Sequence, residues 1–197
     1  DAFAEIGKAW KRLGYPFERL VPSYATSLGA SGDTPKALAD LAGILINNGM
    51  RQPALTVREL HFGEGTPVET LLAARTPPGV RVLHPEIAAL VRARMTGVVE
   101  KGTGRRAFHA FTRPDGTFIP LAGKTGTGDN RFKVFASAGR LTSERVVNRT
   151  ATFVFLIGDR FYGTVTAFVP GEAAGDFRFT SALAVQVLKD LAPDLGP

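Results

Sequence analysis

The chain has 197 residues, a formal net charge of +6 and no cysteine. This length suffices for one domain with a sizeable core, and the lack of cysteine excludes disulfides, thiolate zinc sites and a cysteine nucleophile. A basic chain of this kind could bind nucleic acid, an anionic membrane or an acidic polymer.

The first predicted element is an amphipathic helix over residues 2–13. Its large apolar residues recur at spacings of three and four, as one face of a helix requires: Phe3, Ile6, Trp10 and Leu13. Gly14 and Pro16 end this pattern, because both residue types disfavour a continuing helix. A loop through residues 22–32 then leads to the next element.

A second helix is predicted from Pro35 to about Asn47. Thr34 suits the N-cap, and a proline at the first helical position loses nothing because its missing N–H would have no helical partner there. Four apolar residues are expected on one face of this helix: Leu38, Leu41, Ala42 and Leu45. Gly49 provides the end signal.

The middle of the chain predicts a strand, a loop and a third helix. Residues 54–61 favour a strand, whereas residues 62–78 are typical of a loop. The helix begins at Pro85 and ends near Val99, and these residues continue along it at helical spacing: Ile87, Leu90, Val91, Arg94 and Val98. A flexible turn follows at Lys101–Gly104.

The last third predicts short strands and a closing helix. The strand-like runs are rich in Val, Phe, Thr and Ile and cover residues 118–126, 131–137, 150–157 and 161–169. Gly158–Arg160 suits a hairpin connection. The helix covers residues 179–191, with Leu183, Val187, Leu188 and Leu191 in register. The order of elements predicts an α+β fold, with helices packed on a mainly antiparallel sheet.

No metal, nucleic-acid or membrane site is predicted. The three histidines, His61, His84 and His109, lack metal-ligand spacing. The basic residues are spread along the chain, and their densest patches are typical of a solvated surface: Arg92–Arg94, Lys101–Arg106 and Arg131–Lys133. No apolar run reaches the roughly 18 residues of a membrane helix, and no secretory h-region stands at the start, so any targeting segment is expected to lie outside these residues. We therefore expect no cofactor, and any membrane anchor would lie outside these residues.

The stretch Ala122–Gly128, with sequence AGKTGTG, carries the strongest chemical signal. A lysine on an exposed strand offers a fixed positive charge, neighbouring threonine hydroxyls can bind an anion, and glycine lets another backbone approach closely. The edge of such a strand can bind an extended peptide while the cation holds a carboxylate. This pattern makes Lys124, Thr125, Gly126 and Thr127 the candidate site residues.

Two other interpretations of this stretch compete. Gly123-Lys124-Thr125 matches the end of a phosphate-binding loop, but that motif requires glycine at position 118, which is Phe118, and a helix after the lysine. The second alternative is a structural hairpin turn shaped by Gly126 and Gly128, in which Lys124 is merely solvated. A bare KTG triplet would not exclude that turn, so the surrounding sequence has to decide.

Three ordered phrases resemble the penicillin-binding proteins. The stretch Val98–Ala107 is similar to the family's "GVVxxGTGxxA" phrase, and Ala122–Thr127 is similar to its "AGKTGT" strand. Upstream, Pro22–Ser31 with Thr34-Pro35 and Asn47–Gly49 resembles "PSLALGxxxxTPxxLAxxxxxxANGG". The resemblance covers about residues 14–128. It implies a five-stranded, mainly antiparallel sheet flanked by helices, shared with serine β-lactamases, of which this chain would be an incomplete part.

The resemblance also implies roles for the candidate residues in an acyl-serine enzyme with SxxK, SxN and KTG motifs. Lys124 would help hold the serine of the second motif and attract the substrate carboxylate, and Thr125 and Thr127 would hydrogen-bond that carboxylate. Gly126 completes the KTG motif. The backbone N–H of Thr127 would be one of two oxyanion-hole donors. The carboxylate would belong to a D-Ala-D-Ala stem peptide or to a β-lactam.

The chain also departs from the family pattern. No serine is followed by lysine three positions later, and no SxN is present: Ser23, Ser27, Ser31, Ser137, Ser143 and Ser181 all fail. The run Arg131–Phe135 differs from the family's "WFVGY" strand. Both missing motifs lie upstream of the matched region in the family. Residues 1–197 are therefore expected to be the C-terminal part of one transpeptidase domain, inactive without the serine-bearing segment.

These considerations favour a parent protein that is a cell-wall D,D-transpeptidase of the bifunctional glycosyltransferase type, on the periplasmic side of the inner membrane. Its partners would be stem peptides, β-lactams and the upstream segment of the same protein, and not nucleic acid. Two alternatives stay open: a catalytically silent binding or scaffold module, and a β-lactamase or D,D-carboxypeptidase that shares the same site.

Overall fold

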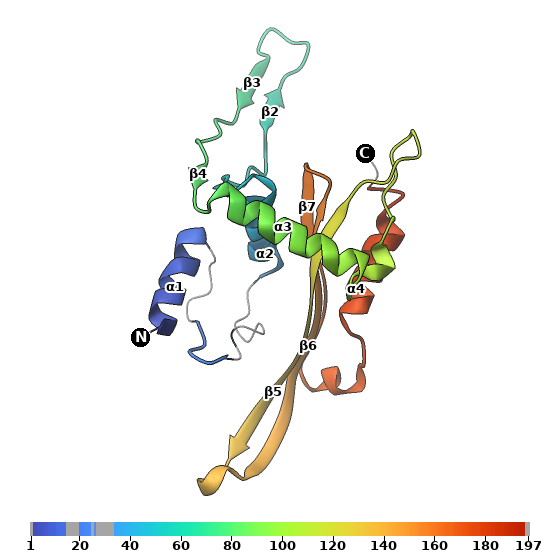
Figure 1. The fold of residues 1–197 in the computed structure, drawn as a ribbon. Coiled ribbons are helices and arrows are strands. Elements are labelled where there is room, and N and C mark those ends of the chain that lie inside the picture. The colour runs from blue at the N-terminus through green and yellow to red at the C-terminus, as the bar shows by residue number, and fades with distance from the viewer. Residues whose placement is uncertain (1, 15–19, 25, 27–33, 196–197) are drawn as a thin grey trace.

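The computed structural model of the protein describes residues 2–14, 20–24, 26 and 34–195 (Figure 1). Pro16 and much of the phrase Pro22–Ser31 therefore lie outside the described residues. The longer helices are α1 (Ala2–Leu13), α2 (Pro35–Ile46), α3 (Pro85–Glu100) and α4 (Ser181–Leu191). The strands are β1 (Met50–Arg51), β2 (Glu59–Phe62), β3 (Thr70–Ala73), β4 (Val80–Arg81), β5 (Leu121–Phe135), β6 (Leu141–Ile157) and β7 (Phe161–Pro170).

The main sheet has three antiparallel strands in the order β5-β6-β7. Gly158–Arg160 joins β6 to β7, with Ile157 opposite Phe161, so the predicted hairpin connection is confirmed. The two strands predicted at 118–126 and 131–137 are instead one continuous strand, β5. Gly126 and Gly128 pair with Thr152 and Thr150 of β6, which also makes the hairpin-turn interpretation of these glycines wrong. Helices packed on an antiparallel sheet confirm the α+β fold.

Helices cover both faces of this sheet. Successive residues of a strand point to opposite faces, and Leu121 and Ala122 of β5 accordingly belong to different core clusters. The first cluster joins β5 and β6 to α4 and the end of α3: Val99, Ala107, Phe111, Ile119, Leu121, Phe153, Ile157, Ala184, Val185, Leu188 and Ala192. The second joins them to α2 and the body of α3: Ala42, Leu45, Ile46, Ala88, Met95, Ala122 and Leu156.

The predicted helices are confirmed, but two of their predicted faces are wrong. Thr34 caps α2 by accepting a hydrogen bond from the N–H of Ala37. On α3 the buried residues are Ala88, Met95 and Val99, while Ile87 and Leu90 stay half exposed. On α4 they are Ala184, Val185 and Leu188, with these larger residues exposed: Leu183, Val187 and Leu191. Small alanine side chains let these helices pack close to the sheet. A pattern based on large apolar residues overlooks such positions.

The segment between α2 and α3 differs most from the prediction. The strand expected at 54–61 begins only at Glu59, and the expected loop at 62–78 contains its partner, β3. Leu60 pairs with Leu72 in this β2–β3 hairpin, and every residue of its two strands is exposed. Figure 1 shows the hairpin projecting from the helical side of the molecule. Without a buried face, it lacks the alternation that identifies strands.

Replacing Gly49 by alanine is expected to lower the free energy of unfolding by about 3 kcal/mol. Gly49 has φ +87°, and a Cβ there would lie 2.2 Å from the carbonyl oxygen of Leu83. Gly65, at φ +73° with open space around it, is the matched control. Gly65→Ala should cost only the backbone strain, about 1 kcal/mol. Urea unfolding measures both changes, and equal losses would contradict a role for the Leu83 contact.

Candidate active site

The candidate residues lie at one edge of the main sheet. Lys124, Thr125, Gly126 and Thr127 follow one another on β5, which has β6 on one side. In the part of the chain that the structure describes, no strand pairs with the other edge of β5 along these residues. Figure 1 shows β5 crossing α3, which packs on one face of the sheet. The predicted exposed strand edge is therefore present.

The backbone of Thr125 and Thr127 points to this open edge. In a strand, the N–H and C=O of one residue face the same side, and adjacent residues alternate. The carbonyl of Pro120 faces β6, where it accepts a hydrogen bond of 2.8 Å from the N–H of Gly158. Even-numbered residues up to Gly128 therefore pair with β6, and odd-numbered ones face outward. The outward main-chain groups of Thr125 and Thr127 face the side on which an extended ligand could pair, although the carbonyl of Thr125 also accepts a hydrogen bond from Lys124.

Lys124 lies on the face of the sheet that packs against α2 and α3. It is opposite Val154 in the β5–β6 register and is exposed. The ammonium nitrogen Nζ lies 2.7 Å from the carbonyl oxygen of Thr125, which places the charge at the open edge. No carboxylate lies within ion-pair distance of it among the described residues. The lysine therefore offers a cation whose charge is not neutralised by a neighbouring side chain.

The two threonine hydroxyls face the α4 side and already have partners. Thr125 is 9% exposed, and its Oγ1 lies 2.6 Å from Oγ1 of Thr103, in the turn after α3. Oγ1 of Thr127 accepts a hydrogen bond of 2.9 Å from the N–H of Ser181, the first residue of α4. Each hydroxyl keeps a further hydrogen-bonding position. The end of α3 and the start of α4 thus fix both side chains.

Two glycines of the motif differ in their surroundings. A Cβ on Gly123 would lie 2.3 Å from the ring of Phe153 in the core, so packing requires glycine there. A Cβ on Gly126 would have no atom within 4 Å. The fold does not need a glycine at position 126, whereas a ligand lying over the strand face that carries Lys124 would gain room from it.

Sequence reasoning missed Thr103 and Ser181 as neighbours of the candidate threonines. Thr103 lies in the GTG phrase that carries part of the resemblance, which is a signal for its position but not for its contact. The histidines are not gathered at this site: His61 contacts Glu69, and His109 stacks on Phe108 and Phe118. Among the described residues, no group of three or more histidine, aspartate or glutamate side chains is arranged to hold a metal.

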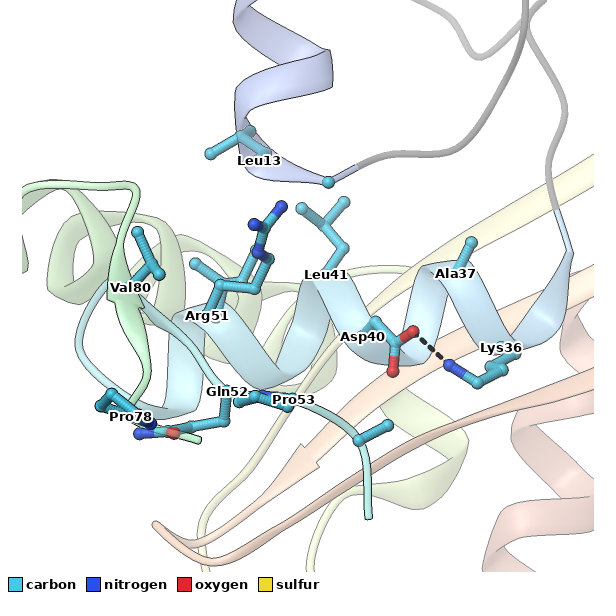
Figure 2. Close-up of a pocket in the computed structure, with 13 residues that line it drawn as sticks. Leu13, Lys36, Ala37, Asp40, Leu41, Arg51, Gln52, Pro53, Pro78 and Val80 are labelled. Atoms are coloured by element: carbon cyan, nitrogen blue, oxygen red, sulfur yellow. Dashed lines mark hydrogen bonds and ion pairs between the residues drawn. The ribbon is translucent and has the colours of Figure 1, made fainter. Parts of the chain in front are cut away.

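The pocket drawn in Figure 2 lies elsewhere. It encloses about 320 Å³ between the end of α1, the outer face of α2 and the segment after β1. Arg51 points into it between Leu41 and Val80, and Lys36 pairs with Asp40 at 2.6 Å near its rim. None of the four candidate residues on β5 lines it. Across the described residues, no helix is long and apolar enough to traverse a bilayer.

Comparison with known proteins gives one family model and several relatives. The model described as "Penicillin binding protein transpeptidase domain" matches residues 6–133. Penicillin-binding protein 1B of Escherichia coli is 30% identical over 125 residues, which is 64% of this chain and 14% of that protein. The protein of the same name from Buchnera aphidicola is 28% identical over 122 residues, or 62% of this chain and 15% of that protein. The chain thus spans about a seventh of these relatives' length.

Solved structures with the same fold cover nearly the whole chain. Penicillin-binding protein 3 of Mycobacterium tuberculosis, complexed with aztreonam, has a TM-score of 0.61 and 17% identity over 98% of this chain and 46% of that chain. The D,D-transpeptidase domain of a peptidoglycan glycosyltransferase from Eggerthella lenta has a TM-score of 0.55 and 18% identity over 98% of this chain and 48% of that one. At these identities the likeness concerns the fold.

Proposed function

The chain belongs to the transpeptidase family of the penicillin-binding proteins, and on that premise we propose that it supplies the substrate-binding strand of a peptidoglycan D,D-transpeptidase. The observation that carries this proposal is the open edge of β5. There the Lys124 ammonium lies beside outward-facing main-chain groups of Thr125 and Thr127. An edge of this kind suits an extended peptide that ends in a carboxylate.

The reaction would proceed through an acyl-serine intermediate. The serine hydroxyl would lose its proton to a base and attack the amide carbonyl between the two D-Ala residues, so that this amide breaks and the terminal D-Ala leaves. With a β-lactam the ring amide would break instead, and the opened ring would stay attached. In both cases the developing oxyanion would accept a hydrogen bond from the N–H of Thr127. One such donor contributes about 2.7–4 kcal/mol to transition-state stabilisation. Lys124, Thr125 and Thr127 hold the substrate carboxylate, and Gly126 leaves room for the peptide. With the stem peptide, an acceptor amine would then attack the acyl-serine ester, form the cross-linking amide and release the serine hydroxyl with its proton restored.

The serine itself would come from a segment upstream of Asp1, so residues 1–197 would be the C-terminal part of one transpeptidase domain. Incomplete packing supports this. Helix α1 is amphipathic but buries none of its side chains, and Ile87 and Leu90 on α3 are half exposed. The main sheet has three strands, where the family resemblance implies five. Because the substrate is the cell wall, the active protein would work on the extracytoplasmic side of the membrane.

A direct experiment is to express the protein from its complete gene and incubate it with a fluorescent penicillin. Covalent labelling that survives denaturation, and that excess unlabelled penicillin prevents, is the expected result. A folded protein without labelling would overturn the transpeptidase and favour a silent scaffold, which the absence of SxxK and SxN from these 197 residues keeps as the second candidate. Rapid turnover of the label would instead indicate a β-lactamase or carboxypeptidase.

Replacing Thr103 by valine is expected to slow acylation by penicillin about tenfold in the same protein. If the hydroxyl of Thr125 donates to the carboxylate, Thr103 must donate to Thr125 across their 2.6 Å contact. Removing that donor leaves a buried oxygen without its partner, which costs about 1–3 kcal/mol. Acylation rates with penicillin and with its methyl ester, which lacks the anionic carboxylate, provide the measurement.

The ester distinguishes positioning from a general structural effect. Thr103→Val should slow acylation by the free acid and change that by the ester much less, while Thr103→Ser should restore most of the rate. Equal slowing with both compounds would contradict a role for Thr103 in orienting Thr125.

A further inference from the structure

Beyond the candidate site, β5 and β6 continue as a two-stranded extension, here called the distal hairpin (residues 129–149). The strand β7 ends at Pro170, opposite Asn148, so within the described sheet no third strand pairs with the hairpin between Asn148 and its tip. Its residues from Asp129 to Arg145 are exposed, apart from the half-buried Ala136 and the undescribed side chain at 138. Figure 1 shows the tip of the hairpin reaching away from α1, α2, α3 and α4, while its base contacts the segment after β7, where the N–H of Gly171 donates to the carbonyl of Val147. An isolated two-stranded hairpin gains little stability from itself in water.

Apolar side chains are spread over both faces of the distal hairpin. Phe132 and Phe135 are each 57% exposed, and Val134 and Leu141 are also exposed. The strand register places Phe135 opposite Leu141 on one face and Phe132 opposite Arg145 on the other. Exposed aromatic rings of this kind are typical of binding surfaces, because they provide large contact areas at little conformational cost.

The charge of the distal hairpin is positive. It contains five Lys and Arg residues and two acidic ones, Asp129 and Glu144. Both acidic residues are already paired with cations, Asp129 with Arg131 at 3.1 Å and Glu144 with Arg131 at 3.4 Å. The hydrogen bond from Arg131 lowers the pKa of Asp129 below its usual value, so that this carboxylate stays ionised. Arg140 and Arg145, nearer the tip, have no ion pair among the described residues.

The β2–β3 hairpin offers an internal comparison. It also projects and exposes apolar residues, including Leu60, Phe62 and Leu72. Between residues 59 and 73, however, it contains three glutamates and no Lys or Arg. The two hairpins therefore share exposed apolar surface and differ in the sign of their charge. Only the distal hairpin is complementary to an acidic partner.

We propose that the distal hairpin binds the acidic stem peptides and glycan strand of peptidoglycan beyond the terminal carboxylate held at Lys124. This inference rests on the proposed function. One continuous strand joins the two places, because β5 runs from Leu121 to Phe135. At about 3.3 Å per residue, the hairpin extends the binding edge by roughly 30 Å. A lipid surface fits less well, since the rings and arginines lie along both faces rather than at the tip alone.

The experiment measures co-sedimentation of the protein, expressed from its complete gene, with purified peptidoglycan sacculi. Arg140→Glu with Arg145→Glu, and separately Phe132→Ser with Phe135→Ser, are each expected to weaken binding about tenfold. The loss in the charge variant should diminish at high salt, because salt screens exposed charges. Phe62→Ser with Leu72→Ser on the acidic hairpin is the matched control and should leave binding unchanged.

Labelling by fluorescent penicillin separates this inference from the proposed function. A small β-lactam occupies only the Lys124 end, so every hairpin variant should label as the unaltered protein does. Unchanged sacculus binding in both distal variants would overturn the inference while leaving the transpeptidase intact. Loss of binding to phosphatidylglycerol vesicles, with sacculus binding retained, would assign the surface to lipid instead. An unaltered protein that fails to label would overturn the proposed function itself.

Discussion

Replacement of Lys124 by alanine is expected to slow acylation by penicillin about a hundred- to a thousandfold and to leave the fold intact. The side chain is exposed and its one recorded contact is the carbonyl of Thr125, so the loss to stability should stay within about 0.5 kcal/mol. The loss to catalysis is large because the substrate carboxylate would be left without its cation. Acylation rates with fluorescent penicillin, beside thermal unfolding, measure the two effects.

Lys133 provides the control for Lys124. It lies on the same strand, is 48% exposed at its side chain and is 3.7 Å from Glu144. Lys133→Ala removes an equal charge from β5, far from the open edge beside Thr125 and Thr127. It should acylate at the normal rate. An unchanged rate in Lys124→Ala as well would mean that Lys124 is merely solvated, and the proposed site would have to be abandoned.

Gly123 and Gly126 flank Lys124 and Thr125, and replacing them by alanine should have different effects: the first should lower stability, and the second should lower activity. Gly123→Ala is expected to lower the free energy of unfolding by about 3 kcal/mol or more, because the new methyl group overlaps the buried ring of Phe153. Gly126→Ala has open space and should leave stability nearly unchanged. Its acylation rate should nevertheless fall about a hundredfold, because the methyl group would stand on the same strand face as Lys124, where a ligand held by that ammonium would lie.

Urea unfolding and penicillin labelling of the two glycine variants give a clear contrast. A stable Gly126→Ala protein that acylates normally would show that no ligand approaches this part of β5. A Gly123→Ala protein as stable as the original would show that the Phe153 ring can move aside, contrary to its complete burial.

Local signals predicted the helices well. Thr34 marks the start of α2 by capping it, and Pro35 and Pro85 suit a first helical turn because proline has a fixed φ and no N–H to leave unpaired. Both helices begin there in the structure. Strand limits depend on distant partners instead. Gly126 and Gly128 suggested a turn, but pairing with Thr152 and Thr150 carries β5 through both glycines. The strand β3 could not be predicted, because among the described strands it pairs only with β2 and both of its faces are exposed. Its sequence therefore shows no alternation of apolar and polar residues.

The candidate site was also predictable only in part from the sequence. Its residue types and their position on a strand followed from the sequence, since Lys124–Thr127 closes one of the phrases shared with the family. The openness of its edge and its outward-facing threonine backbone depend on the register between β5 and β6. The contact of Thr103 with Thr125 spans 22 residues, and no periodicity within one element could predict it.

The hydrogen bond from Ser181 to Thr127 has a genetic consequence. The residues it joins are 54 positions apart, and one of them begins the final helix. A stop codon at position 181 would therefore spare every codon of the KTG motif and still release Thr127, while also removing Ala184, Val185 and Leu188 from the hydrophobic interior. Truncations at or before position 181 should therefore be as damaging as substitutions within the KTG motif.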